Sequence, residues 1–393
     1  MTSSSLTSAG TLPLNGRFLK AGLAIFAACD ILYVGTALSN LSRPRSFGDF
    51  FAFWSDGKLA IENPSSIYDS TALETFQSSL DPGFHGFYPY WNPPSFLLAL
   101  APLGQIPLAP AFAIWVVGTL HLYLLATVGR NWRSLAGVAV LAAPTTLVMI
   151  VSGQNGFLTA ALLVGGLQNL DRRPTLSGVF FGLLTYKPQF FLLIPVVLLA
   201  RRSVRAILSG CATFLTTFLL SGAFFGFALW TQWLSKIFPY SDLLNTHFEL
   251  ERLMPTILAG CHVTAVPKTI SVAIYLATAV AFGFITWKAN REHKTSEVMS
   301  ITIVCVFLTA PYAFIYDTPM ITSALFYEYQ RRKSMARPFT MWEVELALVN
   351  LVLVFGMIST TLPFALFLGL CTLLWAVIRV RPNAPRPEIV VAG

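Results

Sequence analysis

The sequence contains few charged residues. Asp, Glu, Lys and Arg make up 11% of its 393 residues, whereas ordinary soluble domains contain about 25%. Hydrophobic residues reach 55%, and apolar runs of roughly 15 to 20 residues recur between short basic clusters, a pattern that predicts membrane-spanning helices. The runs do not alternate apolar and polar residues, which argues against a membrane β-barrel. The composition therefore excludes a soluble globular protein and predicts an all-α integral membrane protein.

Cysteine is also scarce. The five cysteines lie singly along the chain, and none has the spacing of a redox motif or a metal site. The histidines of the predicted outer loops, His85, His247 and His262, have no paired ligand spacing either. We therefore expect no bound metal and no cofactor, and we interpret the cysteines as packing residues.

The net charge of +8 does not indicate a nucleic-acid partner. The basic residues lie in the connections between apolar runs, where they act as orientation signals. No basic patch is interleaved with aromatic residues that could stack on bases. Of the 26 Lys and Arg residues, 19 lie in segments that share one side of the predicted membrane. The positive-inside rule places this side, with both termini, in the cytoplasm.

The same pattern divides the chain into three regions. Residues 1–16 are polar and predict a disordered cytoplasmic segment, residues 17–380 form a single membrane domain of about ten to twelve spans, and residues 381–393 form a cytoplasmic tail. Within the membrane domain, 39–94 and 230–267 are long loops on the outer face. The first apolar run predicts a retained anchor, with a cleaved signal peptide as the alternative.

Two apolar segments contain a break. Residues 176–200 carry Lys187-Pro188 at their middle and have Arg clusters at both ends. Two short helices that meet at this break would keep both clusters on one side of the membrane, as the positive-inside rule requires. Residues 298–329 are interrupted in the same way at 316–319. The first span holds Asp30, which should face the bundle or a wet cavity.

Four polar features fall on the predicted outer side. The first is the stretch 46–69, which carries four carboxylates including Asp49; the others are Gln154-Asn155, Lys187 and Asp317. A carboxylate can take a proton from a hydroxyl group, and a lysine at a helix break can hold a phosphate. Together they suggest transfer from a lipid phosphate carrier.

Each of these residues also has a structural interpretation. Asp49 is suited to cap the helix that begins near Phe50. Lys187 can extend its amine to the membrane interface. Asp317 can cap the helix that follows it, and Gln154-Asn155 can be a simple turn between spans.

The chain carries several short motifs in a fixed order. They are Asp49-Phe50 through Tyr68-Asp69, Tyr88 to Pro94, Gly153-Gln154-Asn155, Gly178 to Pro188 and Pro311 to Asp317. In their order and spacing the chain resembles glycosyltransferase family 87, multi-span enzymes of the C-type superfamily, from about Arg17 to Tyr329.

The resemblance implies a C-type glycosyltransferase bundle in the bacterial inner (plasma) membrane. It implies inverting transfer of a hexose, often mannose, from a polyprenyl-phosphate sugar donor to a lipid or glycan acceptor at the outer face. Asp49 would be the general base, and Lys187, with Arg252, would stabilise the departing phosphate. The other expected donor- or acceptor-binding residues are Gln154, Asn155, Asp317, Asp56 and Tyr88. Relatives often show Trp or His where this chain has Ile315-Tyr316-Asp317, so the role of Asp317 stays open.

Two other functions remain as alternatives. Broken helices in both halves of the chain are typical of a secondary transporter. A polymerase, ligase or flippase of envelope glycans would share the outer loops, although it does not predict the Asp-aromatic motif of the first loop.

Overall fold

The computed structural model describes residues 47–81, 88–131, 135–236 and 256–334. Within these residues the regular structure is helical and contains no strand, which confirms the predicted all-α class for this part of the chain. The predicted spans at 18–38, 344–358 and 362–378, and Asp30, lie outside the described residues.

The elements are α-helices and short 3-10 helices (η). The first half contains α2 (Phe50–Glu62), η2 (Pro64–Ser66), α3 (Ser70–Leu80), η3 (Pro94–Phe96), α4 (Leu97–Gly104), α5 (Leu108–Thr127), η4 (Gly129–Asn131), α6 (Leu135–Leu141), α7 (Pro144–Ser152) and α8 (Gly156–Asn169). The second half contains α9 (Pro174–Leu184), η5 (Pro188–Phe190), α10 (Ile194–Ala200), α11 (Val204–Phe225), a helical segment at 228–236, α14 (Ile257–Val263), α15 (Lys268–Glu292), α16 (Thr295–Thr309), η6 (Ile315–Asp317) and α17 (Pro319–Ser334).

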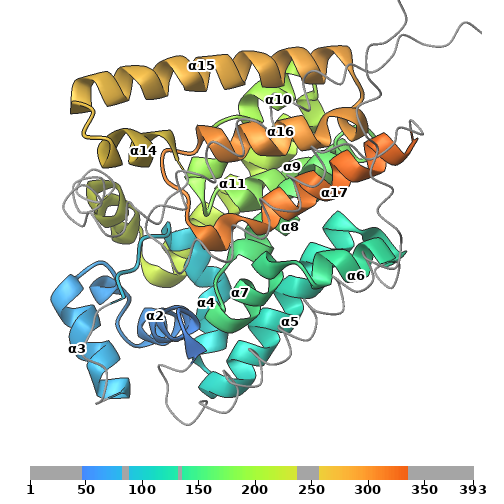
Figure 1. Cartoon of the computed structure of the whole chain (residues 1–393). Coiled ribbons are helices and arrows are strands. Elements are labelled where there is room, and N and C mark those ends of the chain that lie inside the picture. Colours follow the sequence, from blue (N-terminus) through green and yellow to red (C-terminus); the bar gives the residue numbers. More distant parts are fainter. Residues whose placement is uncertain (1–46, 82–87, 132–134, 237–255, 335–393) are drawn as a thin grey trace, which may run out of the picture.

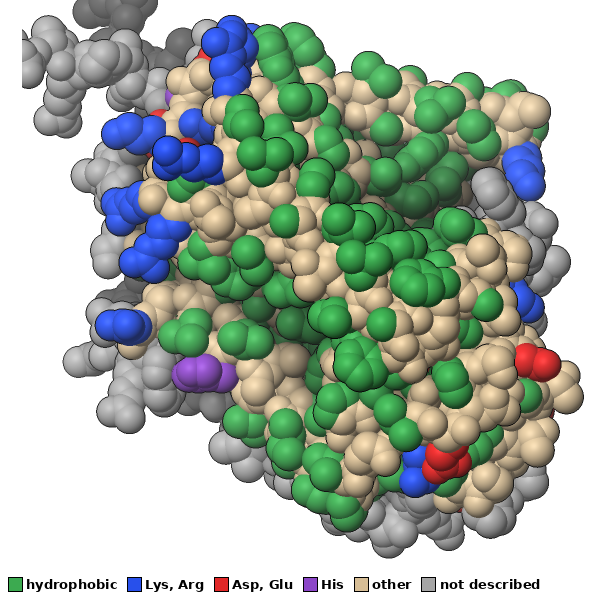
Figure 2. All heavy atoms as spheres, turned by 180° about the vertical axis from the view of Figure 1, so that it is seen from behind, with side chains coloured by type: hydrophobic (Ala, Val, Ile, Leu, Met, Phe, Trp, Pro, Cys, Tyr) green, Lys and Arg blue, Asp and Glu red, His purple; other side chains and the backbone are tan. Residues whose placement is uncertain are grey.

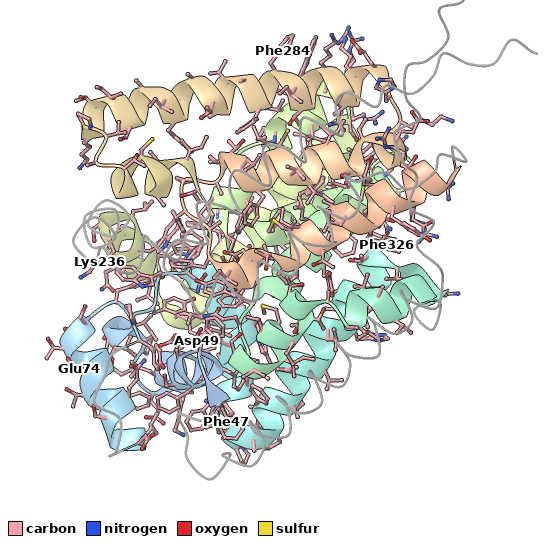
Figure 3. The ribbon with its side chains drawn as sticks, viewed as in Figure 1. Phe47, Asp49, Glu74, Lys236, Phe284 and Phe326 are labelled. Atoms are coloured by element: carbon pink, nitrogen blue, oxygen red, sulfur yellow. The ribbon has the colours of Figure 1, made fainter. Side chains whose placement is uncertain are left out.

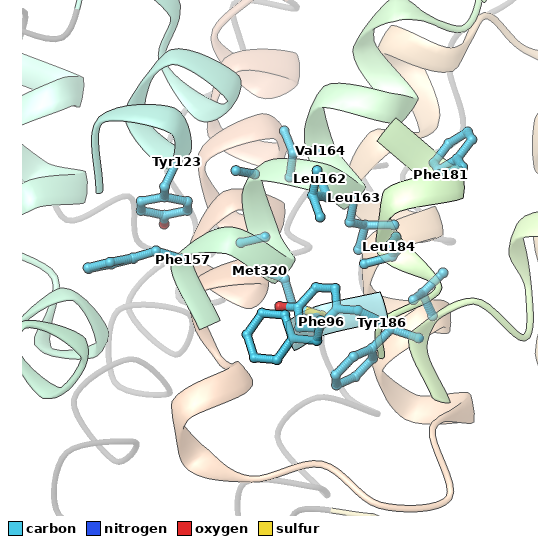
Figure 4. Close-up of a cluster of buried hydrophobic side chains, with 14 of the residues drawn as sticks. Phe96, Tyr123, Phe157, Leu162, Leu163, Val164, Phe181, Leu184, Tyr186 and Met320 are labelled. Carbon is cyan, nitrogen blue, oxygen red and sulfur yellow. The ribbon is translucent and has the colours of Figure 1, made fainter. Parts of the chain in front are cut away.

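Helix α8 is the centre of the described bundle. It packs against α5, α9, α16 and α17, and its residues from Phe157 to Leu167 are almost all buried. Figure 4 shows Leu162, Leu163 and Val164 of this helix among the buried side chains, with Leu184 nearby. Between helices in a membrane such side chains stabilise by close van der Waals packing, so α8 holds the surrounding helices in place.

The other helices lie around this centre. In Figure 1, α15 and α16 form an antiparallel pair along one edge, and α17 runs beside α16. Helices α2, α3 and α4 occupy the opposite corner. Helix α2 packs closely on α4: a Cβ atom built on Gly57 would lie 2.1 Å from the carbonyl oxygen of Leu100, and one on Gly104 would lie 2.2 Å from the amide nitrogen of Lys58. Only glycine allows this approach of the two backbones.

Three of the described helices, α5, α11 and α15, are long and apolar enough to cross a membrane. At 20 to 25 residues they match a hydrocarbon core of about 30 Å. Much of the apolar surface of α11 and α15 is exposed, including Phe224 and Val280 at 72% each, and lipid is a suitable environment for such faces. The remaining apolar helices are shorter, because prolines and polar turns interrupt the runs. The expected number of about ten to twelve spans is therefore not reached within the described residues.

The break at Lys187-Pro188 is confirmed. Helix α9 ends at Leu184, η5 begins at Pro188, and α10 follows from Ile194. The chain thereby turns back, so that Arg201 Nη1 lies 3.8 Å from Asp171 Oδ1. The basic clusters on either side of the segment are thus neighbours. Figure 2 shows Lys and Arg side chains gathered along one side of the molecule, while the membrane side that they face stays a prediction.

The close contact of α2 and α4 predicts unequal effects of two Gly→Ala substitutions. Gly57→Ala should lower the free energy of unfolding by about 1–3 kcal/mol, because its methyl group collides with the backbone of α4. Gly118→Ala on α5, where an added Cβ meets nothing within 4 Å, should leave stability unchanged or raise it by up to about 1 kcal/mol. Thermal unfolding in detergent checks both; equal stability of the two variants would contradict the packing.

Candidate active site

Asp49 immediately precedes α2, but it does not cap that helix. Its backbone is already helical and its side chain makes no capping hydrogen bond, so the capping alternative is wrong. Instead, Gln154 Nε2 donates a hydrogen bond of 2.8 Å to Asp49 Oδ2. Figure 3 shows Asp49 at the α2 side of the molecule. The structure therefore brings two of the predicted site residues into direct contact.

The surroundings of Asp49 alter its acidity. The side chain is largely enclosed, and this burial raises its pKa above the usual carboxyl value, while the hydrogen bond from Gln154 acts in the opposite direction. The net effect is an upward shift. A carboxylate with a raised pKa is a stronger base than an exposed carboxylate with the usual pKa. The hydrogen bond from Gln154 stabilises the ionised form of Asp49, which is the form that can act as a base.

The turn at 152–156 lies between two other segments. A Cβ atom on Gly153 would come within 2.6 Å of Phe50 Cβ, and one on Gly156 within 1.8 Å of the carbonyl oxygen of Tyr316. Gly153 also has φ +61°, and its carbonyl oxygen accepts a 2.9 Å hydrogen bond from Trp115 Nε1. The turn is thus held between α2 and η6. It contacts both segments, whereas the alternative interpretation of Gln154-Asn155 was a simple turn between spans.

Lys187 and Asp317 form a buried ion pair between the two helix breaks. They are 5% and 1% exposed, so Lys187 does not extend to an interface. Asp317 Oδ2 also accepts a 3.0 Å hydrogen bond from the amide of Phe314, which closes η6 itself. The interpretation of Asp317 as the cap of the following helix is therefore wrong. The Lys187 ammonium lies 5.1 Å from the ring centroid of Tyr316, which adds a cation–π contact.

Tyr186 connects the two halves of this region. Its hydroxyl lies 2.6 Å from Thr159 Oγ1 and donates a 3.2 Å hydrogen bond to the carbonyl oxygen of Asn155. Its ring stacks on Phe96 at 4.6 Å between centroids (Figure 4), and Phe96 in turn contacts Phe53 of α2. Asp49, Gln154-Asn155, Lys187 and Asp317 therefore belong to one continuous network of contacts.

The other carboxylates of the stretch 46–69 have different surroundings. Asp69 caps α3 by accepting from two backbone amides, and Glu62 pairs with Lys58 at 3.3 Å on the surface. Asp56 is 1% exposed and lies within electrostatic range of Tyr68 and Tyr90. Burial raises the pKa of Asp56 well above the usual carboxyl value. Of these four carboxylates, Asp49 is thus the one that is partly exposed and also accepts a hydrogen bond from the turn at 152–156.

Of two other predicted binding residues, Asn155 and Arg252, the structure describes only Asn155. Asn155 is 2% exposed, and its Oδ1 atom has no hydrogen-bond partner within the described part of the chain. Arg252 lies outside the described residues. Across residues 47–81, 88–131, 135–236 and 256–334, no group of His, Cys, Asp and Glu side chains is arranged to hold a metal ion.

Tyr88 is held near Asp49 by a residue that the sequence analysis missed. Gln77 Oε1 accepts a 3.0 Å hydrogen bond from the Tyr88 amide, and Gln77 Nε2 donates one of 2.9 Å to the Tyr88 carbonyl oxygen. Burial raises the pKa of the half-buried Tyr88 phenol, and the charge of Asp49 raises it further. The available signal was the position of Gln77 one turn after Leu73, on the buried face of an otherwise exposed α3.

The comparison with family models identifies the chain. The model of glycosyltransferase family 87 matches residues 90–311, more than half of the 393 residues. The chain belongs to glycosyltransferase family 87. No curated protein and no solved structure matches it. Membership confirms the resemblance found in the motifs, makes the chain a glycosyltransferase, and favours the enzyme over the transporter alternative.

The matched range covers part of the network in this family 87 glycosyltransferase. It includes Gln154, Asn155 and Lys187, whereas Asp49 and Asp317 lie outside it. The hydrogen bond from Gln154 and the ion pair with Lys187 attach these two carboxylates to the matched region.

The buried ion pair of this glycosyltransferase predicts a non-additive effect on stability. Lys187→Met should lower the free energy of unfolding by about 3–5 kcal/mol, because it leaves Asp317 buried and unpaired. Lys187→Met combined with Asp317→Asn should recover most of this loss, since the Asn side chain can still accept from Phe314. Lys58→Met, which breaks an exposed pair, should cost less than about 1 kcal/mol. Chemical unfolding in detergent measures all three; additive losses would contradict a direct coupling of the pair.

Proposed function

We propose that the enzyme transfers a hexose, with mannose as the first candidate, from a polyprenyl-phosphate sugar to a hydroxyl group of a lipid or glycan acceptor. Transfer takes place with inversion at the outer face of the bacterial inner membrane, within a bundle of about ten to twelve spans with cytoplasmic termini. The observation that carries this proposal is the contact of Asp49 with Gln154, in the same network as the buried Lys187–Asp317 pair. A base and a cation on two sides of one turn suit displacement of a phosphate by a hydroxyl.

Asp49 acts as the general base in this scheme. Its carboxylate takes the proton of the acceptor hydroxyl while the oxygen attacks the anomeric carbon from the face opposite the phosphate. The bond between the anomeric carbon and the phosphate oxygen breaks, and both electrons of that bond leave with the lipid phosphate. Gln154 orients the carboxylate. The proton on Asp49 then passes to solvent.

Lys187 stabilises the departing phosphate. Asp317 supplies the counter-charge that the buried ammonium requires before the donor binds. In the bound state the phosphate shares the ammonium with Asp317, and the low dielectric of the surroundings strengthens the attraction. Arg252 is the second proposed phosphate ligand. No general acid is required, because a phosphate is a good leaving group, and the proposed reaction uses no cofactor.

Two of the remaining proposed residues, Asn155 and Tyr88, contact the sugars. Asn155 has a buried amide oxygen without a partner in the described part of the chain. This oxygen is suited to accept a hydrogen bond from a hydroxyl group of the sugar donor. Tyr88, half-buried and close to the charge of Asp49, suits the acceptor. Asp56 is enclosed, and we assign it to the support of α2 rather than to direct contact with substrate.

Replacement of the proposed base tests this function. Asp49→Asn should lower sugar transfer from a mannosyl-phospho-polyprenol by about 10²–10⁴-fold, measured as radiolabel moved from this lipid to acceptor in detergent-solubilised membranes. The variant should remain folded, because it removes a charge that burial disfavours. Glu62→Gln on the exposed face of the same helix should keep wild-type activity. An Asp49→Asn enzyme that retains most of its activity would remove Asp49 from this role.

The acidity of Asp49 predicts a change in pH dependence. The base must be ionised, and burial raises its pKa, so activity should fall as the pH drops through a value above the usual carboxyl range. Gln154→Met removes the hydrogen bond that lowers this pKa, so the acidic limb of log kcat/KM should move to higher pH. The measurement is a pH–rate profile of both enzymes with the same donor. A limb that stays in place or moves to lower pH would contradict the assignment of Asp49 as the base.

A further inference from the structure

Arg201, the residue that follows α10, has an incompletely satisfied guanidinium group. Its Nη1 atom lies 3.8 Å from Asp171 Oδ1, which is longer than a hydrogen bond. The Asp171 carboxylate is occupied by Thr295: Oδ2 accepts from the Thr295 amide at 3.1 Å, and Oδ1 accepts from its hydroxyl at 2.9 Å. Arg201 Nε and Nη2 are buried and have no acceptor within the described part of the chain.

Such a group is costly unless an acceptor is provided. A buried donor without a partner loses its hydration without compensation, and the loss is larger for a charged group. The carboxylate of Glu297 is also within electrostatic range of Arg201, but it accepts no hydrogen bond from Nε or Nη2. The free donors Nε and Nη2 form a planar fork that matches two oxygens of one phosphate.

The surface around Arg201 combines positive charge with apolar side chains. Four more arginines, at 172, 173, 202 and 205, are exposed and lie close in sequence to Asp171 or Arg201. On the flanking helices, Leu199 of α10 and Leu208 of α11 are each 64% exposed. A basic cluster next to exposed leucines, one of them on the membrane-length helix α11, suits a lipid headgroup and its acyl chains better than a free ion.

We propose that Arg201 is the centre of a binding site for the phosphate group of an anionic phospholipid, whose acyl chains lie against Leu199 and Leu208. The phosphate oxygens accept from Nε and Nη2, and the neighbouring arginines contribute positive charge. On the predicted topology this site faces the cytoplasmic leaflet, where anionic lipids attract basic segments. The site is separate from the sugar-transfer chemistry and does not depend on it.

The test measures lipid binding and stability of the full chain in nanodiscs. One set contains phosphatidylcholine alone, and the other contains phosphatidylcholine with phosphatidylglycerol. Native mass spectrometry counts the phosphatidylglycerol that stays bound, and thermal unfolding measures the stability gain. Wild type should retain phosphatidylglycerol and unfold at a higher temperature in its presence. Arg201→Gln should lower the retention about tenfold and lose the stability gain.

Arg205→Gln is the matched control, because it removes one positive charge from an exposed position in the same cluster. It should retain phosphatidylglycerol nearly as wild type does. Arg201→Lys keeps the charge but lacks the fork, so it should bind as weakly as Arg201→Gln and covers the case in which the Gln variant does not fold. Equal losses in Arg201→Gln and Arg205→Gln would overturn the site, since they would show a diffuse charge effect. A stability gain from inorganic phosphate in phosphatidylcholine nanodiscs, equal to that from phosphatidylglycerol, would overturn the assignment to a lipid.

Discussion

The close approach of the 152–156 turn to two other segments is the constraint on which the candidate active site depends. On one side, a Cβ atom added to Gly153 would collide with Phe50; on the other, one added to Gly156 would collide with the carbonyl oxygen of Tyr316. A side chain at either position would push these backbones apart. With glycine at both, Gln154 reaches Asp49, and the same turn contacts the segment that carries Asp317. The site thus depends on space left free at two positions.

The buried ion pair adds an electrostatic constraint to this steric one. Lys187 and Asp317 come from breaks in two helical segments that are 130 residues apart, and each carboxylate or ammonium left alone would be strongly disfavoured in this interior. Their pairing therefore fixes how α9 and η6 meet. Because Lys187 is already paired, an anionic ligand can bind its ammonium group only while Asp317 also interacts with it. This suits a phosphate that binds and then leaves.

The two ends of the described structure have different chemistry. One holds carboxylates, aromatic rings and the central turn, and the other holds the arginines around Asp171 and Arg201. Between them lie the exposed apolar faces of α11 and α15. The break at Lys187-Pro188 maintains this division, because it returns the chain to the basic side after a short excursion. A straight helix over the same residues would have placed one arginine cluster at each end.

The helical class, the break at Lys187-Pro188, the separation of basic from acidic segments and, through the motifs, the family could all be predicted from the amino-acid sequence. These follow from composition, proline geometry and local order, which need no knowledge of contacts. It also named Asp49, Gln154, Lys187 and Asp317 without showing which of them touch. The folded chain was needed to show that Asp49 bonds Gln154 rather than capping α2, that Asp317 pairs with Lys187, and that Gln77 holds Tyr88. This is because burial and hydrogen-bond partners depend on segments that are far apart in the chain. The spacing of residues along the sequence does not specify which of several polar groups will be buried next to each other.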